Sequence, residues 1–184
     1  MSKKVEYSFS SIISIDPYMG SYLSNTSSFI SDLKSIQFSK DQYIISYLNS
    51  KNFINSQISI SKNILDDDLH DAIANKVYDE LALDQTIAYQ IEFTEIFNLP
   101  DEYNRNFYVF AIESLKIREI FKKRVGKIKY IDFIIPSPLL LKSLYIKDIV
   151  ESDGVHCYIY FQKNDASVTI YNKKEFLYTK SINY

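Results

Sequence analysis

The residues best suited to chemistry in this chain are a run of acidic side chains around one histidine. Asp66, Asp67 and Asp68 are consecutive, and His70 and Asp71 follow after one leucine. Carboxylates and imidazole can ligate a metal ion, but consecutive residues of a helix point in different directions, so at most two of them could share one. Carboxylates also suit the first turn of a helix, at the positive end of its dipole. We expect this second role, and no metal site.

Histidine and cysteine are too few and too widely separated to suggest a catalytic pair. The two histidines, His70 and His156, fall in different predicted elements, and no metal-ligand spacing joins them to Cys157. His156 and Cys157 are neighbours on a predicted strand, so their side chains point to opposite faces. Asp16 and Asp132 could form a distant carboxylate pair, but no nucleophile or tuned base accompanies them. We expect no catalytic residue and no enzyme activity.

The composition restricts the class of protein further. The chain has 184 residues, of which 46% are hydrophobic, enough for the core of one domain or of two packed lobes. A net charge of −2 gives no general attraction for nucleic acid or anionic lipid. Only three glycines occur and neither phosphate-binding glycine motif is present, so we expect no cofactor.

Targeting signals are also missing from the sequence. No apolar run reaches the roughly 20 residues of a membrane-spanning helix, and the lysines near the N-terminus are not followed by a long apolar segment. The single cysteine suits a reducing compartment. We therefore expect a soluble, cytoplasmic protein.

Two helices must position the polar residues considered above. The first begins at an Asn63 cap, contains the acidic run in its first turn and extends to Leu81. The second begins at Ser114 and ends before Gly126, which is suited to the position after a helix. The stripe of the first helix that we expect to be buried consists of Leu65, Leu69, Ile73, Val77 and Leu81.

The only basic cluster of the chain lies at the end of the second predicted helix. It could contact acidic lipid headgroups or an acidic partner, or it could simply complement the negative end of the helix dipole. Its members are Lys122, Lys123 and Arg124, followed by Lys127 and Lys129.

Around these helices, the hydrophobic pattern predicts strands and further short helices. We expect helices over 25–38 and, behind a Ser137 cap and Pro138, over 137–144. The segment from 53 to 135 then has the order strand, helix, strand, strand, helix, strand. The strands are expected over 5–15, 42–48, 53–60, 86–93, 106–112 and 128–135, and in a C-terminal meander over 155–161, 167–171 and 175–182.

Five stretches in this order resemble one family, and together they cover roughly the last two-thirds of the chain. The family comprises the actin-like assembly proteins of type IV pili and the cytoplasmic domain of the type II secretion L protein. The stretches are Gln57 to Ile73, Glu80 to Ile91, Phe107 to Ile112, Gly126 to Pro136, and the hairpin region from Asp153 to Tyr178.

The resemblance implies an α/β fold of the actin-like, or ribonuclease H-like, kind. Such a fold has a mixed sheet with helices and, here, an inserted β-α-β-β-α lobe. We expect residues 1–50 and 127–184 to form a discontinuous sheet lobe and residues 51–126 to form the inserted lobe.

Two departures from the family bear on nucleotide binding. Where ATP-binding members have an Asp-x-Gly turn in the second phosphate hairpin, this chain has Tyr160-Phe161-Gln162-Lys163. Near the N-terminus, Asp16 and the distant Gly20 replace a compact glycine turn. The chain also stops where a second lobe would begin. We therefore expect no nucleotide binding.

The function that the resemblance implies is non-catalytic. The chain would be a cytoplasmic scaffold domain of a type IV pilus, type II secretion or DNA-uptake (competence) machine, at the cytoplasmic face of the inner membrane. It would dock the assembly ATPase or an inner-membrane platform protein, with no direct contact to nucleic acid, and could form a homodimer. A membrane-spanning helix could follow residue 184. The alternatives are a nucleotide-binding actin-like ATPase subunit and a stand-alone enzyme.

In the family, partners bind at the inserted lobe or beside it. This implies docking residues on the two helices of the expected lobe. Asp71 and Asn75 lie on the polar face of the first helix, and Lys122 and Lys123 lie at the end of the second. These four residues are the predicted partner-binding site.

Overall fold

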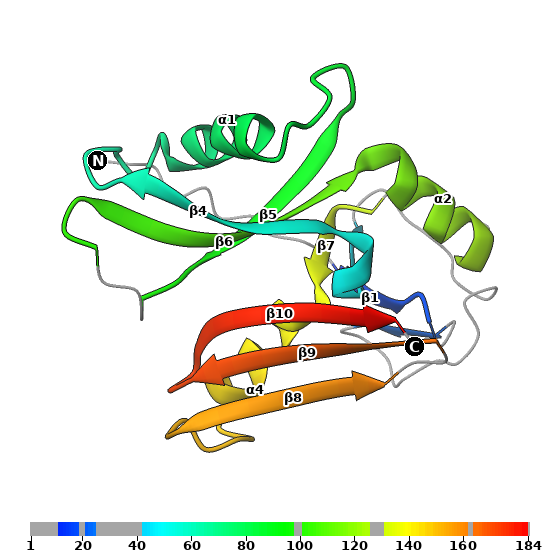
Figure 1. Ribbon diagram of the computed structural model, residues 1–184. Coiled ribbons are helices and arrows are strands. Elements are labelled where there is room, and N and C mark those ends of the chain that lie inside the picture. Colours follow the sequence, from blue (N-terminus) through cyan, green and yellow to red (C-terminus); the bar gives the residue numbers. More distant parts are fainter. Residues whose placement is uncertain are drawn as a thin grey trace. The chain divides into compact units, whose positions relative to one another are not determined.

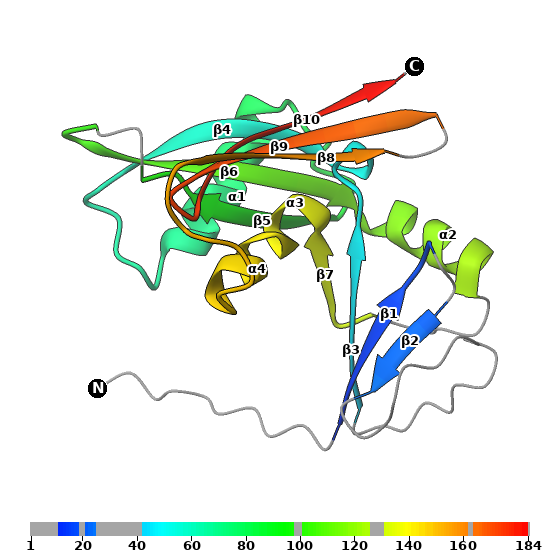
Figure 2. The same ribbon diagram turned by 90° about the horizontal axis from the view of Figure 1, so that it is seen from below.

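The computed structural model describes residues 11–18, 21–24, 42–97, 101–125, 131–161 and 164–183 (Figures 1 and 2). The chain separates into two compact units. The first unit comprises residues 1–47 and 118–135, and the second comprises residues 48–117 and 136–184. None of the described helices is long and apolar enough to cross a membrane.

The first unit is built on a mixed four-stranded sheet in the order β2-β1-β3-β7 (Figure 2). Strand β1 (Ser11–Asp16) pairs antiparallel with β2 (Ser21–Ser24) and parallel with β3 (Gln42–Leu48), and β7 (Phe133–Pro136) lies at the edge beyond β3. Apolar side chains at alternate positions supply its core, because successive strand residues face opposite sides. The buried members are Ile13, Ile15, Ile44 and Ile134.

The second unit contains two three-stranded antiparallel sheets. In the first, the long β6 (Asn104–Glu113) lies between β4 (Ile54–Ser61) and β5 (Tyr89–Glu95). Helix α1 (Leu69–Glu80) covers one face of this sheet (Figure 1). The core between helix and sheet consists of Ile58, Ile60, Leu69, Ile73, Val77, Leu83, Phe107, Val109 and Ala111.

The second sheet is the C-terminal meander β8 (Val155–Phe161), β9 (Asp165–Asn172) and β10 (Glu175–Asn183), in the order β10-β9-β8. Aromatic rings join the two sheets of this unit. Phe176 of the meander packs edge-on against Tyr108 and Phe110 of β6, at 5.0 and 6.2 Å between ring centroids. Two short helices, α3 (Ser137–Leu140) and α4 (Lys142–Ile146), precede the meander.

The predicted order of elements is confirmed over most of the described residues. The exceptions are β2, which was not predicted, the strand expected over 128–135, which within the described residues is present only from Phe133, and the helix expected over 137–144, which is divided into α3 and α4. The strand at 53–60, the helix from Ser114 (α2, Ser114–Val125) and the meander are present within one to three residues of their expected bounds. The strand expected at 86–93 is β5, which starts three residues later and ends two residues later than expected. The helix expected at 25–38 and Gly126 lie outside the described residues. The expected division into lobes, 1–50 with 127–184 and 51–126, stays a prediction.

The predicted start of the first helix is wrong. Leu69, Ile73 and Val77 are buried as expected, but α1 begins at Leu69, not at Asn63. The acidic run forms a turn before the helix, in which the Asp68 N–H donates to the Leu65 carbonyl oxygen at 3.0 Å. Leu65 therefore lies outside the helical spacing and is 70% exposed.

Candidate functional site

A polar groove opens on the second unit, in a cavity of about 790 Å³. Its size falls in the range of ligand and peptide sites, roughly 300–1,000 Å³. Three segments far apart in the sequence form it: the stretch that leads into β4, the middle of β6 and the end of β10. The lining residues are Ser50, Lys51, Phe53, Asn55, Ser56, Gln57, Tyr108, Tyr178, Thr179, Lys180, Ser181 and Asn183.

Tyr108 joins the two sheets at the groove. Its hydroxyl oxygen lies 3.0 Å from the Thr179 carbonyl oxygen of β10 and 2.8 Å from the Asn55 side chain of β4. Burial raises the pKa of the Tyr108 hydroxyl to about 12. A hydrogen bond between the Ser50 and Ser181 hydroxyls, 2.8 Å long, joins the stretch before β4 to β10. The groove is therefore preformed by polar bonds between its walls.

The charge of the groove is positive. Its lining includes two lysines and no carboxylate. Lys51 is paired with the buried carboxylate of Asp165, so part of its charge is already neutralised. Lys180 is exposed, and no ion pair involves it within the described residues. The groove is thus suited to an anionic ligand such as an acidic segment of another protein.

The predicted partner-binding residues do not lie in this groove. Asp71 and Asn75 are exposed one turn apart on α1, and the Asp71 carboxylate lies 3.9 Å from His70 Nδ1. Lys122 is exposed near the end of α2, in the part that belongs to the first unit. Lys123 belongs to the same helix, but its side chain is outside the described residues. Their role in docking stays a prediction.

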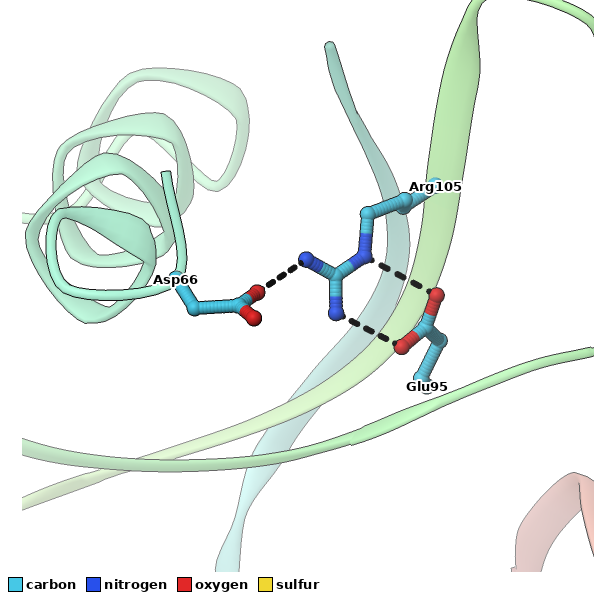
Figure 3. A network of polar contacts seen from close by, with 3 residues as sticks. All are labelled: Asp66, Glu95 and Arg105. Atoms are coloured by element: carbon cyan, nitrogen blue, oxygen red, sulfur yellow. Dashed lines mark hydrogen bonds and ion pairs between the residues drawn. The ribbon is translucent and has the colours of Figure 1, made fainter. Parts of the chain in front are cut away.

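One residue of the acidic run, Asp66, has a structural partner on β6. Arg105 of β6 donates two hydrogen bonds to the Glu95 carboxylate, at 3.0 Å from Nε and 2.8 Å from a terminal nitrogen, and its other terminal nitrogen donates to Asp66 at 2.7 Å (Figure 3). These two carboxylates raise the pKa of the guanidinium above its usual value. Arg105 thereby ties the turn before α1 to the sheet. The described residues contain no group of three or more His, Cys, Asp or Glu side chains arranged for a metal ion.

His156 takes part in a chain of hydrogen bonds with two tyrosines. Its Nε2 lies 2.9 Å from the Asp153 carbonyl oxygen, which can only accept, so Nε2 carries the proton and Nδ1 accepts from the Tyr145 hydroxyl at 2.9 Å. Tyr145 in turn accepts from the Tyr158 hydroxyl at 2.8 Å. Burial raises the pKa of the Tyr145 hydroxyl above its usual value. The chain holds α4 against the meander, while Cys157 on the opposite side of β8 is exposed.

The two remaining candidate carboxylates bind backbone. Asp16 accepts from the Tyr18 N–H at 2.8 Å, and Asp132 accepts from the Ile44 N–H at 2.7 Å. Each therefore stabilises the end of a strand or a turn in the first unit.

The groove was not predicted from the sequence. Its residues come from positions near 50, 108 and 180, and none of them forms a local motif. A weak signal existed in Lys180, which interrupts an otherwise uncharged stretch of the last strand.

Comparison with known proteins identifies the fold. No family model matches the chain, and no curated protein matches it. Among solved structures, it is similar to the PilM-PilN type IV pilus biogenesis complex, with a TM-score of 0.54 and 14% identity over 79% of this chain and 44% of that chain. This chain thus spans less than half the length of that match.

A second similar structure is the cytoplasmic domain of EpsL, an inner membrane component of the type II secretion system of Vibrio cholerae. The TM-score is 0.50 and the identity 11%, over 95% of this chain and 71% of that chain. The expected α/β fold of the actin-like kind, and the resemblance on which it was based, are confirmed.

Proposed function

We propose that this chain is a non-catalytic scaffold domain that docks a protein partner in a type IV pilus or type II secretion machine, on the cytoplasmic side of the inner membrane. Two observations support the proposal: the fold is similar to components of both kinds of machine, and the second unit carries a preformed polar groove. In this proposal residues 51–126 are the inserted lobe. The partner is the assembly ATPase or an inner-membrane platform protein.

The positive groove is the single observation that carries the docking role. Its walls are joined by the Tyr108 and Ser50 bonds, so a ligand meets an ordered surface and loses less free energy to ordering. The exposed Lys180, which has no ion pair within the part of the chain that the structure describes, favours a partner with acidic residues. Among the described lining residues, no serine hydroxyl is hydrogen-bonded to a basic side chain, so the role that we propose is binding without chemistry.

Binding measurements with purified candidate partners test this proposal. We expect the assembly ATPase, or the cytoplasmic segment of the platform protein, to bind the chain, and Lys180→Glu to weaken binding by roughly fivefold or more. Lys147→Glu is the matched control, because Lys147 is also exposed, lies outside the groove and changes the net charge equally. Failure of both partners to bind, or equal effects of the two variants, would contradict docking in the groove.

The partner-binding residues predicted from the sequence offer a different location for the docking surface. If Lys122 and Lys123 form the docking surface, their double replacement by Glu should weaken binding and flatten its salt dependence, because exposed charges act mainly on the association rate. Replacement of Asp71 and Asn75 by Ala tests the face of α1 in the same way. The variant that weakens binding therefore identifies the surface that docks the partner.

A further inference from the structure

Strand β8 is an edge strand without the usual protection against pairing. It lies at the end of the sheet order β10-β9-β8 and pairs only with β9 among the described residues (Figure 1). Its seven residues, VHCYIYF, include no Lys, Arg, Asp, Glu, Pro or Gly, and its pairing with β9 contains no bulge. Natural proteins block exposed edges with charges, prolines or bulges, because a free edge is a template for another strand.

The outer face of the same sheet is mostly apolar, above all along β8. Val155, Cys157, Ile159 and Phe161 of β8 share one face, since alternate strand residues point to the same side. The register places Ile170 and Val168 of β9 beside Cys157 and Ile159, and the face continues on β10 with Tyr178, Lys180 and Ile182, of which Lys180 is the charged member at the opposite edge. Val155 and Phe161 are 67% and 71% exposed. The solvated face of an antiparallel sheet is normally polar, so this face indicates a covered surface.

We propose that β8 pairs antiparallel with β8 of a second copy of this chain, about a two-fold axis at Tyr158. This arrangement joins the two meanders into one six-stranded sheet. In this register Val155 lies opposite Phe161 of the second copy, and Cys157 lies opposite its Ile159. On the other face, His156 lies opposite Tyr160, and Tyr158 meets its own equivalent.

The self-complementarity of β8 favours a second copy over a strand of another protein. An antiparallel two-fold pairing brings the same surface of both copies together, so like charges would face each other if the strand had any. Here every pair consists of apolar or aromatic residues, and no like charges face each other. The other long edge strand with no charged residue, β4, has Asn55, Gln57 and Ser59 at exposed positions and offers no such match.

The size of the contact predicts a weak dimer. Two paired seven-residue strands bury less than the roughly 1,600 Å² of a standard stable interface. The dimer should therefore appear only at high protein concentration, on the order of tens to hundreds of micromolar. This inference is independent of the proposed docking function, because it requires neither the groove nor a partner protein.

Cysteine cross-linking tests the register. In Ile159→Cys, the new thiol lies directly opposite the native Cys157 of the second copy, at a Cα separation of about 4.5–5.5 Å that suits a disulfide. Val155→Cys is the matched control, because position 155 has the same two-residue spacing from Cys157 within the chain. Across the interface, however, position 155 lies opposite Phe161 of the second copy. The Cys157 of that copy is four residues further along its strand, about 13 Å away.

Mild oxidation should convert Ile159→Cys to a covalent dimer several times faster than Val155→Cys or the unchanged chain. Equal rates for the two variants would overturn the proposed register and the two-fold pairing at Tyr158.

Sedimentation velocity over a concentration series tests whether the chain dimerises through the β8 edge. We expect the unchanged chain to dimerise reversibly and Ile159→Lys to remain monomeric, because a lysine on the edge strand blocks pairing. Ile182→Lys is the control: Ile182 lies on the same apolar face and is 48% exposed, against 53% for Ile159, but it lies on β10 at the opposite edge. A chain that stays monomeric throughout, or equal loss of dimer in both variants, would overturn pairing through β8.

Discussion

At the scale of the single residue, the surroundings of Glu92 disfavour the ionised form of its carboxyl group. Glu92 lies on β5 directly opposite Phe110, and burial raises the pKa of its carboxyl, against smaller opposing effects of the Gln90 amide and of His70. A carboxyl with a raised folded-state pKa holds its proton more tightly in the folded state. The free energy of unfolding therefore falls as the pH rises from the unfolded pKa, about 4.3, through the folded value.

We predict that Glu92→Gln stabilises the protein at neutral pH. The neutral amide has nearly the same shape and removes the cost of a half-buried charge, so the gain at pH 7 should be about 0.5–1 kcal/mol. The gain should shrink as the pH falls towards 4, where the native carboxyl becomes protonated. Urea denaturation at both pH values checks this, with the exposed Glu119→Gln as a control of equal charge change. A variant less stable than the parent at pH 7 would contradict it.

Arg105 offers a second prediction, because the two carboxylates it binds differ in burial. Glu95 is 21% exposed, whereas Asp66 is 84% exposed. Arg105→Met leaves the half-buried Glu95 charge unpaired and should cost roughly 1–3 kcal/mol. Asp66→Asn removes only the exposed ion pair and should cost about 0.5 kcal/mol or less. Equal losses in a urea titration would mean that Glu95 does not depend on Arg105.

At the scale of the element, helix α1 is held by a narrow apolar stripe. Ile73 is fully buried between the helix and the sheet, so Ile73→Ala should cost about 2–5 kcal/mol. Asn75→Ala, on the exposed side of the same helix, should change the free energy of unfolding by about 0.5 kcal/mol or less. Leu65→Ala should be equally mild, because Leu65 precedes the helix and is exposed. A large loss for Leu65→Ala in a denaturant titration would show that the acidic turn packs into the core.

At the scale of the whole molecule, the scaffold proposal and its nucleotide-binding alternative make opposite predictions. The connection between β8 and β9 runs from Phe161 to Asp165 without a glycine. Cβ atoms there limit how many backbone amides can converge on a phosphate. Titration calorimetry with Mg-ATP should give no saturable heat. A dissociation constant for Mg-ATP in the micromolar range would contradict the scaffold proposal and support an ATPase subunit.

Local patterns in the sequence were sufficient for the type and order of most of the elements and for the resemblance that indicated the fold. The three- and four-residue spacing of Leu69, Ile73 and Val77 predicted the buried face of α1, since one helix turn brings such positions together. Alternation predicted β4 and the meander in the same way. These signals lie within a few residues of one another, so no knowledge of the tertiary structure was needed.

The tertiary structure alone decided where α1 starts and where the groove lies. The helix begins at Leu69, after a turn in which the carboxylate of Asp66 binds Arg105, 39 residues away in the sequence. The groove exists because Tyr108 of β6 reaches Thr179, a separation of 71 residues. Capping patterns and periodicity describe neighbours along the chain, whereas these contacts depend on which strands meet in space. For that reason the sequence could indicate the kind of protein but not the surface with which it would bind.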